Sequence, residues 1–242
     1  MPNINNRFCN SLPPWYNCSM IKTVIFDIYD TLILVERHAN ADIVMDCLRR
    51  AGIEPDRGEF LKRWSSYYRA AELSDEFRTE AEIFYDRVAW LYGVYGCGDD
   101  PRRAYNATVE KSAGRVAYPD AAETLDALRK RYSVVAGTNA DDTPLTAHLK
   151  KNGLQLDTLY TSEDLRIYKP KEEFYLAILE AEGIRPEEAV FVGDSHKEDV
   201  EAPTALGIRS IWMSRGREHK DYGQVFTADS LSQLPELIGQ VK

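Results

Sequence analysis

Short apolar runs that end in polar turns recur through most of the chain. Each run is too short for a helix and is rich in β-branched and aromatic residues, a pattern typical of buried strands. The runs are KTVIFDI (22–28), YSVVAGTNA (132–140), DTLYTSED (157–164), EAVFVGDS (188–195) and IRSIWMS (208–214). Together they predict the strands of a sheet.

Amphipathic stretches separate the later strands. They are DAAETLDALRKR (120–131), TPLTAHLKKNG (143–153), KEEFYLAILEAEG (171–183) and VEAPTALG (200–207). Gly153 and Gly183 stand where a helix C-terminus favours glycine. Strands that alternate with helices in this way predict an α/β fold, with a parallel sheet covered on both faces.

The interval between about Glu36 and Val116 breaks this rhythm, because nothing in it has the pattern of a strand. Apolar residues recur there at three- and four-residue steps, which predicts helices. The segments are ANADIVMDCLRRAG (39–52), RGEFLKRWSSYYRAAEL (57–73), TEAEIFYDRVAWLYGVYG (79–96) and DPRRAYNATVEKS (100–112). We therefore expect an α/β core of residues 20–36 and 116–242, with an all-α domain inserted at 37–115.

Residues 1–19 differ in composition from the rest of the chain, since they are polar and turn-rich. Two interpretations remain open for this N-terminal extension. Met20 is the ancestral start of the domain, or the extension is an ordered arm that packs Trp15 and Tyr16 on the body of the protein.

Charge and cysteine content exclude several classes of function. The 39 acidic residues outnumber the 30 basic ones, giving a net charge of −9, which argues against binding to nucleic acid or anionic lipid. No apolar run approaches the ~18 residues of a membrane span, and the first residues lack a signal-peptide pattern. The four cysteines are widely spaced without a C-x-x-C pair. We therefore expect no zinc site or disulfide framework, and a cytoplasmic location.

Polar side chains stand at the carboxyl ends of the predicted strands, where open parallel sheets bind their ligands. Taken singly, an Asp there is usually a helix N-cap, a Thr-Asn pair a turn and a Lys a solvated side chain. Their occurrence in order at successive strand ends predicts one converged site. The residues are Asp27, Thr138, Asn139, Lys169, Asp194 and Asp199.

These residue types fit together chemically. An aspartate such as Asp27 can serve as a covalent nucleophile. Three clustered carboxylates repel one another unless a cation offsets their charge. Oxygen ligands without a nearby His or Cys ligand indicate Mg²⁺ rather than zinc. Lys169 would neutralise the nucleophile and a transferring anionic group, while Thr138 would hold the remaining oxygens.

Four segments resemble the motifs of the haloacid dehalogenase (HAD) superfamily. They are FDIYDTL (26–32), VVAGTN (134–139), YKP (168–170) and GDSHKEDV (193–200). The resemblance extends from about Met20 to Leu237 and includes a helical cap inserted after the first strand. It implies a Rossmann-like core with a parallel sheet and an all-α cap domain.

The resemblance also implies roles for individual residues. Asp27 attacks an electrophile and is later released by water. In the phosphatases of the family the metal is held by the nucleophile, by the main-chain carbonyl two residues later and by carboxylates of the fourth motif. The matching positions here are Asp27, Tyr29, Asp194 and Asp199. Lys169 and the pair Thr138 and Asn139 match the third and second motifs.

Tyr29 departs from the phosphatase pattern, in which an Asp at this position acts as general acid and base. A phenol is a poor base at neutral pH. Family dehalogenases carry Tyr here, because a halide needs no proton to leave, and FDIYDTL is close to their FDxYGTL. Asp30 is next to Tyr29, but it matches a family position that points away from the substrate.

The fourth motif favours the phosphatase interpretation. Dehalogenases of the family work without metal and typically have Ser in place of the first acidic residue, whereas Asp194 is present here. We give Asp194 and Asp199 the greater weight, because a metal-binding pair has no use in a dehalogenase. Without a general acid, phosphoryl transfer is slower but still occurs, and the loss of rate is smallest for acyl and aryl phosphates.

The sequence therefore predicts a hydrolase, a Mg²⁺-dependent phosphohydrolase acting on a small phosphorylated metabolite such as a phosphate ester or acyl phosphate. Two alternatives remain: a 2-haloacid dehalogenase-like hydrolase, and a catalytically weakened HAD-fold binding protein. Substrate contacts and oligomeric state stay open. Candidate cap residues for contact with an anionic substrate are Arg37, His38, Arg63 and Arg69. Phosphonate cleavage is a minor option that needs a Schiff-base lysine from the cap, and the sequence does not place Lys62 or Lys111 against the site.

Overall fold

The computed structural model describes residues 20–72, 74 and 76–241. Its centre is a parallel six-stranded sheet of order β3-β2-β1-β4-β5-β6. The strands are β1 (Thr23–Phe26), β2 (Ser133–Thr138), β3 (Thr158–Thr161), β4 (Ala189–Gly193), β5 (Arg209–Met213) and β6 (Phe226–Ala228). The strand order reverses at β1, which pairs with β2 on one side and β4 on the other.

Side chains that alternate along the central strands build a core on each face of the sheet. In β1, Val24 and Phe26 belong to one cluster and Ile25 to the other. All three are fully buried, since both faces are covered by helices. This explains why the strand is continuously apolar in sequence.

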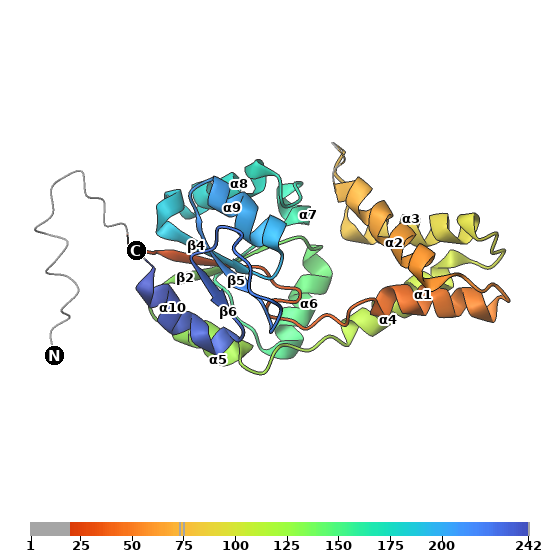
Figure 1. Ribbon diagram of the computed structural model, residues 1–242, viewed down its shortest axis with the longest axis horizontal. Coiled ribbons are helices and arrows are strands. Elements are labelled where there is room, and N and C mark those ends of the chain that lie inside the picture. The colour runs from red at the N-terminus through yellow and green to blue at the C-terminus, as the bar shows by residue number, and fades with distance from the viewer. Residues whose placement is uncertain (1–19, 73, 75, 242) are drawn as a thin grey trace, which may run out of the picture.

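Helices of the α/β core cover the two faces of the sheet (Figure 1). They are α5 (Ala121–Arg129), α6 (Asp142–Asn152), α7 (Ser162–Leu165), α8 (Glu172–Glu182), α9 (Ala202–Ala205) and α10 (Leu234–Gln240). Apolar residues of α5, α6 and α10 pack on one face, and those of α8 on the other. A π-helical turn, His196–Glu201, precedes α9.

The inserted helices pack on one another rather than on the sheet. They are α1 (Ala39–Arg50), α2 (Arg57–Glu72), α3 (Glu80–Val94) and α4 (Pro101–Ala113), and they share a separate hydrophobic core. Figure 1 shows them beyond one end of the sheet, and we call them the cap. Local signals fix two helix starts: Thr79 forms a capping box with Glu82, and Asp100 caps α4 ahead of Pro101.

The cap docks on the core through the segment that leads into α3. Main-chain N–H groups of Glu80 and Ala81 both donate to the Asp141 carboxylate, each at 2.8 Å. The Tyr168 hydroxyl donates to the Arg78 carbonyl at 3.0 Å. Asp141 lies two residues after Asn139 in sequence, and Tyr168 directly precedes Lys169. The docking contacts therefore adjoin the predicted site.

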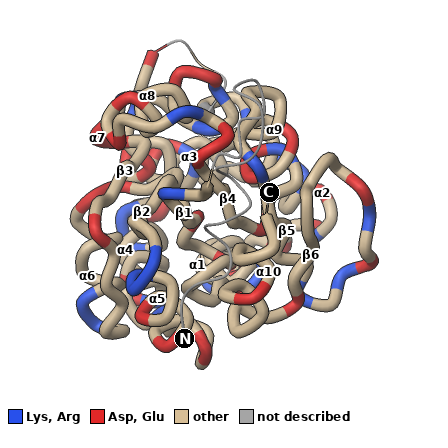
Figure 2. Tube along the Cα trace, turned by 90° about the vertical axis from the view of Figure 1, so that its left-hand side faces the viewer, with Lys and Arg blue, Asp and Glu red and all other residues tan. Residues whose placement is uncertain are grey.

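The expected α/β fold with its parallel sheet and inserted all-α cap is confirmed. All five expected strands are present, and β6 was missed. The domain limits at 36/37 and 115/116 stay a prediction, and the expectations for residues 1–19 lie outside the described residues. Within the described part of the chain, no helix is long and apolar enough to cross a membrane. Acidic and basic residues are interspersed along most elements (Figure 2).

Candidate active site

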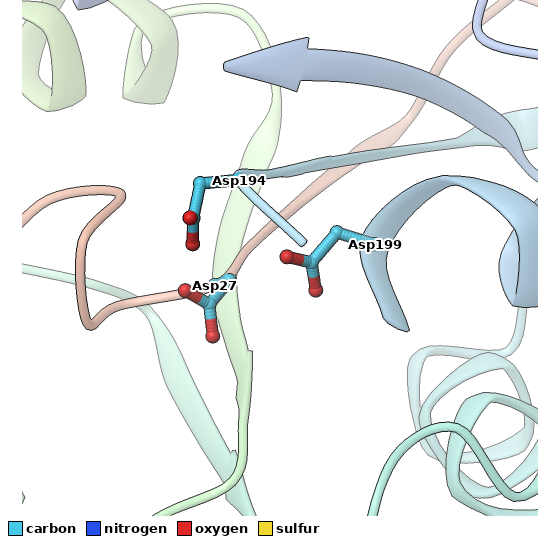
Figure 3. A group of neighbouring side chains, drawn as sticks. All are labelled: Asp27, Asp194 and Asp199. Atoms are coloured by element: carbon cyan, nitrogen blue, oxygen red, sulfur yellow. The ribbon is translucent and has the colours of Figure 1, made fainter. Parts of the chain in front are cut away.

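Three aspartates converge at the carboxyl ends of the two central strands. Asp27 follows β1 and Asp194 follows β4, while Asp199 comes from the π-helical turn. One carboxylate oxygen of each residue lies within 4.8 Å of those of the other two. Figure 3 shows the three side chains pointing toward one another. The parallel pairing of β1 with β4 produces this convergence, because it aligns the ends of both strands.

The end of β4 must be glycine for Asp199 to reach the site. A Cβ atom at Gly193 would lie 2.3 Å from Cγ of Asp199 and 2.5 Å from its Cβ, far inside normal contact. The carboxylate of Asp199 is held there by the main-chain N–H of Ser195, which donates to Oδ2 at 2.9 Å. Asp199 is only 1% exposed.

Lys169 joins two of the aspartates. Its Nζ donates to Oδ1 of Asp27 at 3.0 Å and to Oδ1 of Asp199 at 2.8 Å, and the lysine is 1% exposed. Burial alone would lower the pKa of Lys169, but attraction by Asp199 and Asp27 outweighs it and holds the pKa well above its ordinary value. The ammonium is therefore charged and fixed.

Thr138 and Asn139, at the end of β2, have different roles. Thr138 Oγ1 donates to Oδ1 of Asp27 at 3.0 Å, so it helps to orient the nucleophile candidate. Asn139 instead braces Lys169: its Oδ1 accepts the main-chain N–H of Lys169 at 2.8 Å, and its Nδ2 donates to the Lys169 carbonyl at 3.2 Å. The structure thus brings Thr138 to Asp27 and turns Asn139 toward the lysine backbone.

The Tyr29 hydroxyl contacts helix α6. It lies 2.9 Å from Nδ1 of His148, a residue of that helix, and among the described residues no hydrogen bond joins it to Asp27. Burial, followed by repulsion from Glu80, raises the pKa of Tyr29 above its ordinary value. The neighbouring Asp30 accepts a hydrogen bond from the Tyr118 hydroxyl at 3.0 Å. This contact supports the interpretation that Asp30 does not replace the general acid.

The acidic cluster carries more negative charge than Lys169 offsets. Burial, and then repulsion from Asp27 and Asp199, raises the pKa of Asp194 to about 8. Burial also raises the pKa of Asp199, to about 6, against the attraction of Lys169. A set of converging carboxylate oxygens with raised pKa values fits a hard divalent cation, which would restore the charged form of each ligand.

Two cavities are lined by cap residues, and one of them reaches the core segment that follows Asp194. One of about 400 Å³ is lined by the segments that enter and leave the cap, and another of about 570 Å³ faces residues 195–198. Trp64, Ser65 and Arg87 line both. Of the cap residues considered from the sequence, His38 and Lys111 line the first cavity and Arg69 the second, whereas Arg37 and Lys62 are exposed and Arg63 pairs with Glu59.

The sequence interpretation missed two residues near Tyr29. Nδ1 of His148 lies within hydrogen-bond distance of the Tyr29 hydroxyl, and the guanidinium of Arg115 lies 4.8 Å from the centre of the Tyr29 ring. Neither stands at a strand end. The only sequence signal is that His148 interrupts the apolar face of α6, where Leu145 and Leu149 are buried.

Comparison with known proteins shows the family of this chain. A model of the haloacid dehalogenase-like hydrolase family matches residues 21–207. The (S)-2-haloacid dehalogenase 4A of Burkholderia cepacia is 33% identical over 227 residues, covering 90% of this chain and 93% of that protein. The glyceraldehyde 3-phosphate phosphatase of Methanopyrus kandleri is 27% identical over 210 residues, covering 82% and 86%.

Solved structures show the same fold. The HAD-hydrolase YfnB of Bacillus subtilis, described as bound to magnesium, superposes with a TM-score of 0.72 at 19% identity, covering 91% of this chain and 99% of that chain. The L-2-haloacid dehalogenase of Xanthobacter autotrophicus superposes with a TM-score of 0.71 at 21% identity, covering 92% and 100%.

Proposed function

Because the chain belongs to the haloacid dehalogenase-like hydrolases, we propose that it is a Mg²⁺-dependent phosphohydrolase in which Asp27 attacks a small phosphorylated metabolite. The observation that supports this function best is the convergence of Asp27, Asp194 and Asp199. Without a divalent cation, this cluster would repel any anionic substrate, including a 2-haloacid. With one, the same carboxylates form a site for phosphoryl oxygens.

Each residue then has a defined task. Thr138 and Lys169 both donate to Oδ1 of Asp27 and orient its carboxylate for attack. Lys169 also stabilises the negative charge that develops on the transferring phosphoryl group. Asn139 fixes the backbone that carries Lys169. Asp27, Asp194, Asp199 and the main-chain carbonyl of Tyr29 would hold the cation, which would neutralise charge on the phosphoryl oxygens.

Two further expectations, on the class of substrate and on the cellular location, belong to this proposal. We expect a phosphate ester or acyl phosphate as substrate, rather than a nucleic acid or a membrane. The cytoplasmic location stays a prediction that rests on the widely spaced cysteines.

A second candidate function is hydrolysis of a 2-haloacid. It is favoured by Tyr29, which follows the nucleophile candidate as in family dehalogenases, and by the haloacid dehalogenases among the relatives. This function predicts halide release that needs no divalent cation. It gives no role to the Asp194 carboxylate, which is why we place it second.

The proposed function predicts that the purified protein releases phosphate from 4-nitrophenyl phosphate in the presence of Mg²⁺. Chelation should abolish turnover, and Asp27→Asn should reduce it by at least ~10³-fold, because the nucleophile is lost. Asp164→Asn, on the short helix α7, is a matched control that should retain wild-type turnover. Turnover that survives in Asp27→Asn would contradict the proposed nucleophile.

A further inference from the structure

A hydrogen-bonded chain connects Tyr29 with the end of the cap. The Tyr29 hydroxyl is 2.9 Å from Nδ1 of His148, and Nε2 of His148 is 2.9 Å from the main-chain carbonyl oxygen of Ser112. Ser112 is in the last turn of α4, His148 in α6, and Tyr29 two residues after Asp27. Three separate parts of the chain therefore meet at one imidazole, which is 4% exposed.

The direction of these hydrogen bonds follows from the chemistry of the partners. A carbonyl oxygen only accepts, so Nε2 of His148 carries the hydrogen and donates it to Ser112. In the neutral imidazole the other nitrogen, Nδ1, is then an acceptor. The Tyr29 hydroxyl must therefore donate to Nδ1, and its proton points toward α6. Burial favours this neutral imidazole, because it lowers the pKa of His148.

Other side chains of α6 contact the same end of the cap independently of His148. Helix α4 ends with main-chain carbonyls that have no partner within the helix, and side chains of α6 supply donors for two of them. His148 donates to Ser112, and Lys151 Nζ donates to Ala113 at 2.9 Å. One turn along α6, Asn152 accepts from Ala117 N at 2.7 Å. The imidazole of His148 is held by its own two hydrogen bonds, one to the end of α4 and one to Tyr29.

We propose that His148 is a positioning residue that turns the Tyr29 proton away from Asp27, which restricts this chain to phosphorylated substrates whose leaving group departs as a stable anion. The substrate class is acyl phosphates and phosphates of acidic phenols or enols. This inference rests on the proposed phosphohydrolase function.

Both chemical steps balance without a proton from Tyr29. In the first, an oxygen of Asp27 forms a bond to phosphorus, and the bond from phosphorus to the leaving oxygen breaks. The electron pair leaves with that oxygen as a carboxylate, phenolate or enolate. In the second, water attacks phosphorus, the bond to Asp27 breaks, and both hydrogens of the water stay on the product as dihydrogen phosphate. An alkoxide leaving group would need the proton that this site withholds.

The test is the dependence of kcat/KM on leaving-group pKa, measured with Mg²⁺ on acetyl phosphate, 4-nitrophenyl phosphate and phenyl phosphate. We expect a steep dependence in the wild type, with phenyl phosphate at least ~100-fold below 4-nitrophenyl phosphate, because general acid catalysis typically contributes 10²–10⁴-fold. Tyr29→Asp should raise kcat/KM for phenyl phosphate by about tenfold or more, with no comparable gain for acetyl phosphate.

His148→Phe removes the acceptor and frees the Tyr29 hydroxyl to turn toward the leaving group. We expect a shallower dependence in this variant and a steep one again in His148→Phe combined with Tyr29→Phe. Lys151→Met removes a neighbouring contact between α6 and α4 without touching Tyr29, and should keep the wild-type dependence. An equal loss on every substrate in His148→Phe, with the steep dependence unchanged, would assign His148 a structural role only and contradict the inference.

A second comparison does not require His148→Phe to fold. Tyr29→Phe alone should keep the steep wild-type dependence, because the hydroxyl proton is not used. A Tyr29→Phe enzyme whose kcat/KM falls selectively on phenyl phosphate would show that Tyr29 is the acid and overturn the inference. Phosphate release with a shallow dependence in the wild type would also overturn it while leaving the proposed function intact. Absence of Mg²⁺-dependent release from all three substrates would instead reject the proposed function.

Discussion

The missing side chain at Gly193 determines where Asp199 can lie. The Asp199 carboxylate and its Cβ occupy the space that a Cβ at residue 193 would need. From there the carboxylate pairs with Lys169, which in turn binds Asp27. One backbone position at the end of β4 thus controls the geometry of the whole acidic cluster.

We therefore expect Gly193→Ala to displace Asp199 and break its pair with Lys169. Hydrolysis should fall by on the order of 10²-fold, since a shift of about 1 Å in a catalytic group has effects of that size. The free energy of unfolding should fall by about 1–3 kcal/mol because the site is overpacked. Steady-state kinetics and urea denaturation measure both.

Gly93→Ala is the matched control, because a Cβ at Gly93 on helix α3 meets nothing within 4 Å. This variant should keep wild-type activity and gain about 0.5–1 kcal/mol from helix propensity. A Gly193→Ala enzyme with wild-type turnover would show that the position of Asp199 does not matter for catalysis.

At the level of secondary-structure elements, the start of helix α3 holds the cap on the core. The Asp141 carboxylate accepts the main-chain N–H groups of Glu80 and Ala81. The Glu80 side chain accepts a hydrogen bond from the Tyr68 hydroxyl. Burial, with added repulsion from Asp141, raises the pKa of Glu80 to about 7.

This shift predicts a pH dependence of stability with a definite sign. The pKa of Glu80 is higher in the folded state than its ordinary value of 4.5, so the folded state binds more protons between pH 4.5 and about 7. The group therefore destabilises the fold progressively as pH rises through that window. The shift in the pKa of Glu80 corresponds to roughly 3 kcal/mol of stability lost across this window.

Glu80→Gln should remove this dependence, raising the free energy of unfolding at pH 8 relative to the wild type and leaving it nearly equal at pH 4.5. Glu110→Gln, an exposed position on α4, is the control and should follow the wild-type curve at every pH. Denaturant unfolding at several pH values measures both variants. Identical pH profiles for Glu80→Gln and the wild type would show that the raised pKa of Glu80 is not the cause of the pH dependence.

The elements also show why sequence patterns predicted most of the fold. Strands β1, β2 and β4 are buried on both faces, so their apolar runs are continuous and unmistakable. Strand β6 was missed because it has only three residues, Phe226–Ala228, and pairs with one neighbour at the edge of the sheet. Three residues are too few for a period to be recognised.

Over the whole molecule, some site residues could be found from the sequence and others could not. Asp27 and Asp194 were predicted from their positions, since parallel strands align their carboxyl ends at one edge of the sheet. Lys169 was also predicted at a strand end, but it lies beyond α7 rather than at the end of β3, so tertiary packing brings it to the aspartates. His148 was not, because its contact with Tyr29 joins positions 119 residues apart and depends on how α6 faces the first strand. The brace between Asn139 and the Lys169 backbone is likewise a product of tertiary packing.

The whole molecule combines an acidic cluster suited to a divalent cation with a tyrosine where family phosphatases have an aspartate. The two candidate functions differ in the product released and in the need for metal. Both properties can be read in a single preparation of the protein.

The decisive experiment measures phosphate release from acetyl phosphate and chloride release from (S)-2-chloropropionate in parallel, with Mg²⁺ and with a chelator. We predict phosphate release that depends on Mg²⁺ and no chloride release under either condition. Chloride release that persists with the chelator, in the absence of phosphate release, would contradict the phosphohydrolase function and identify the chain as a dehalogenase.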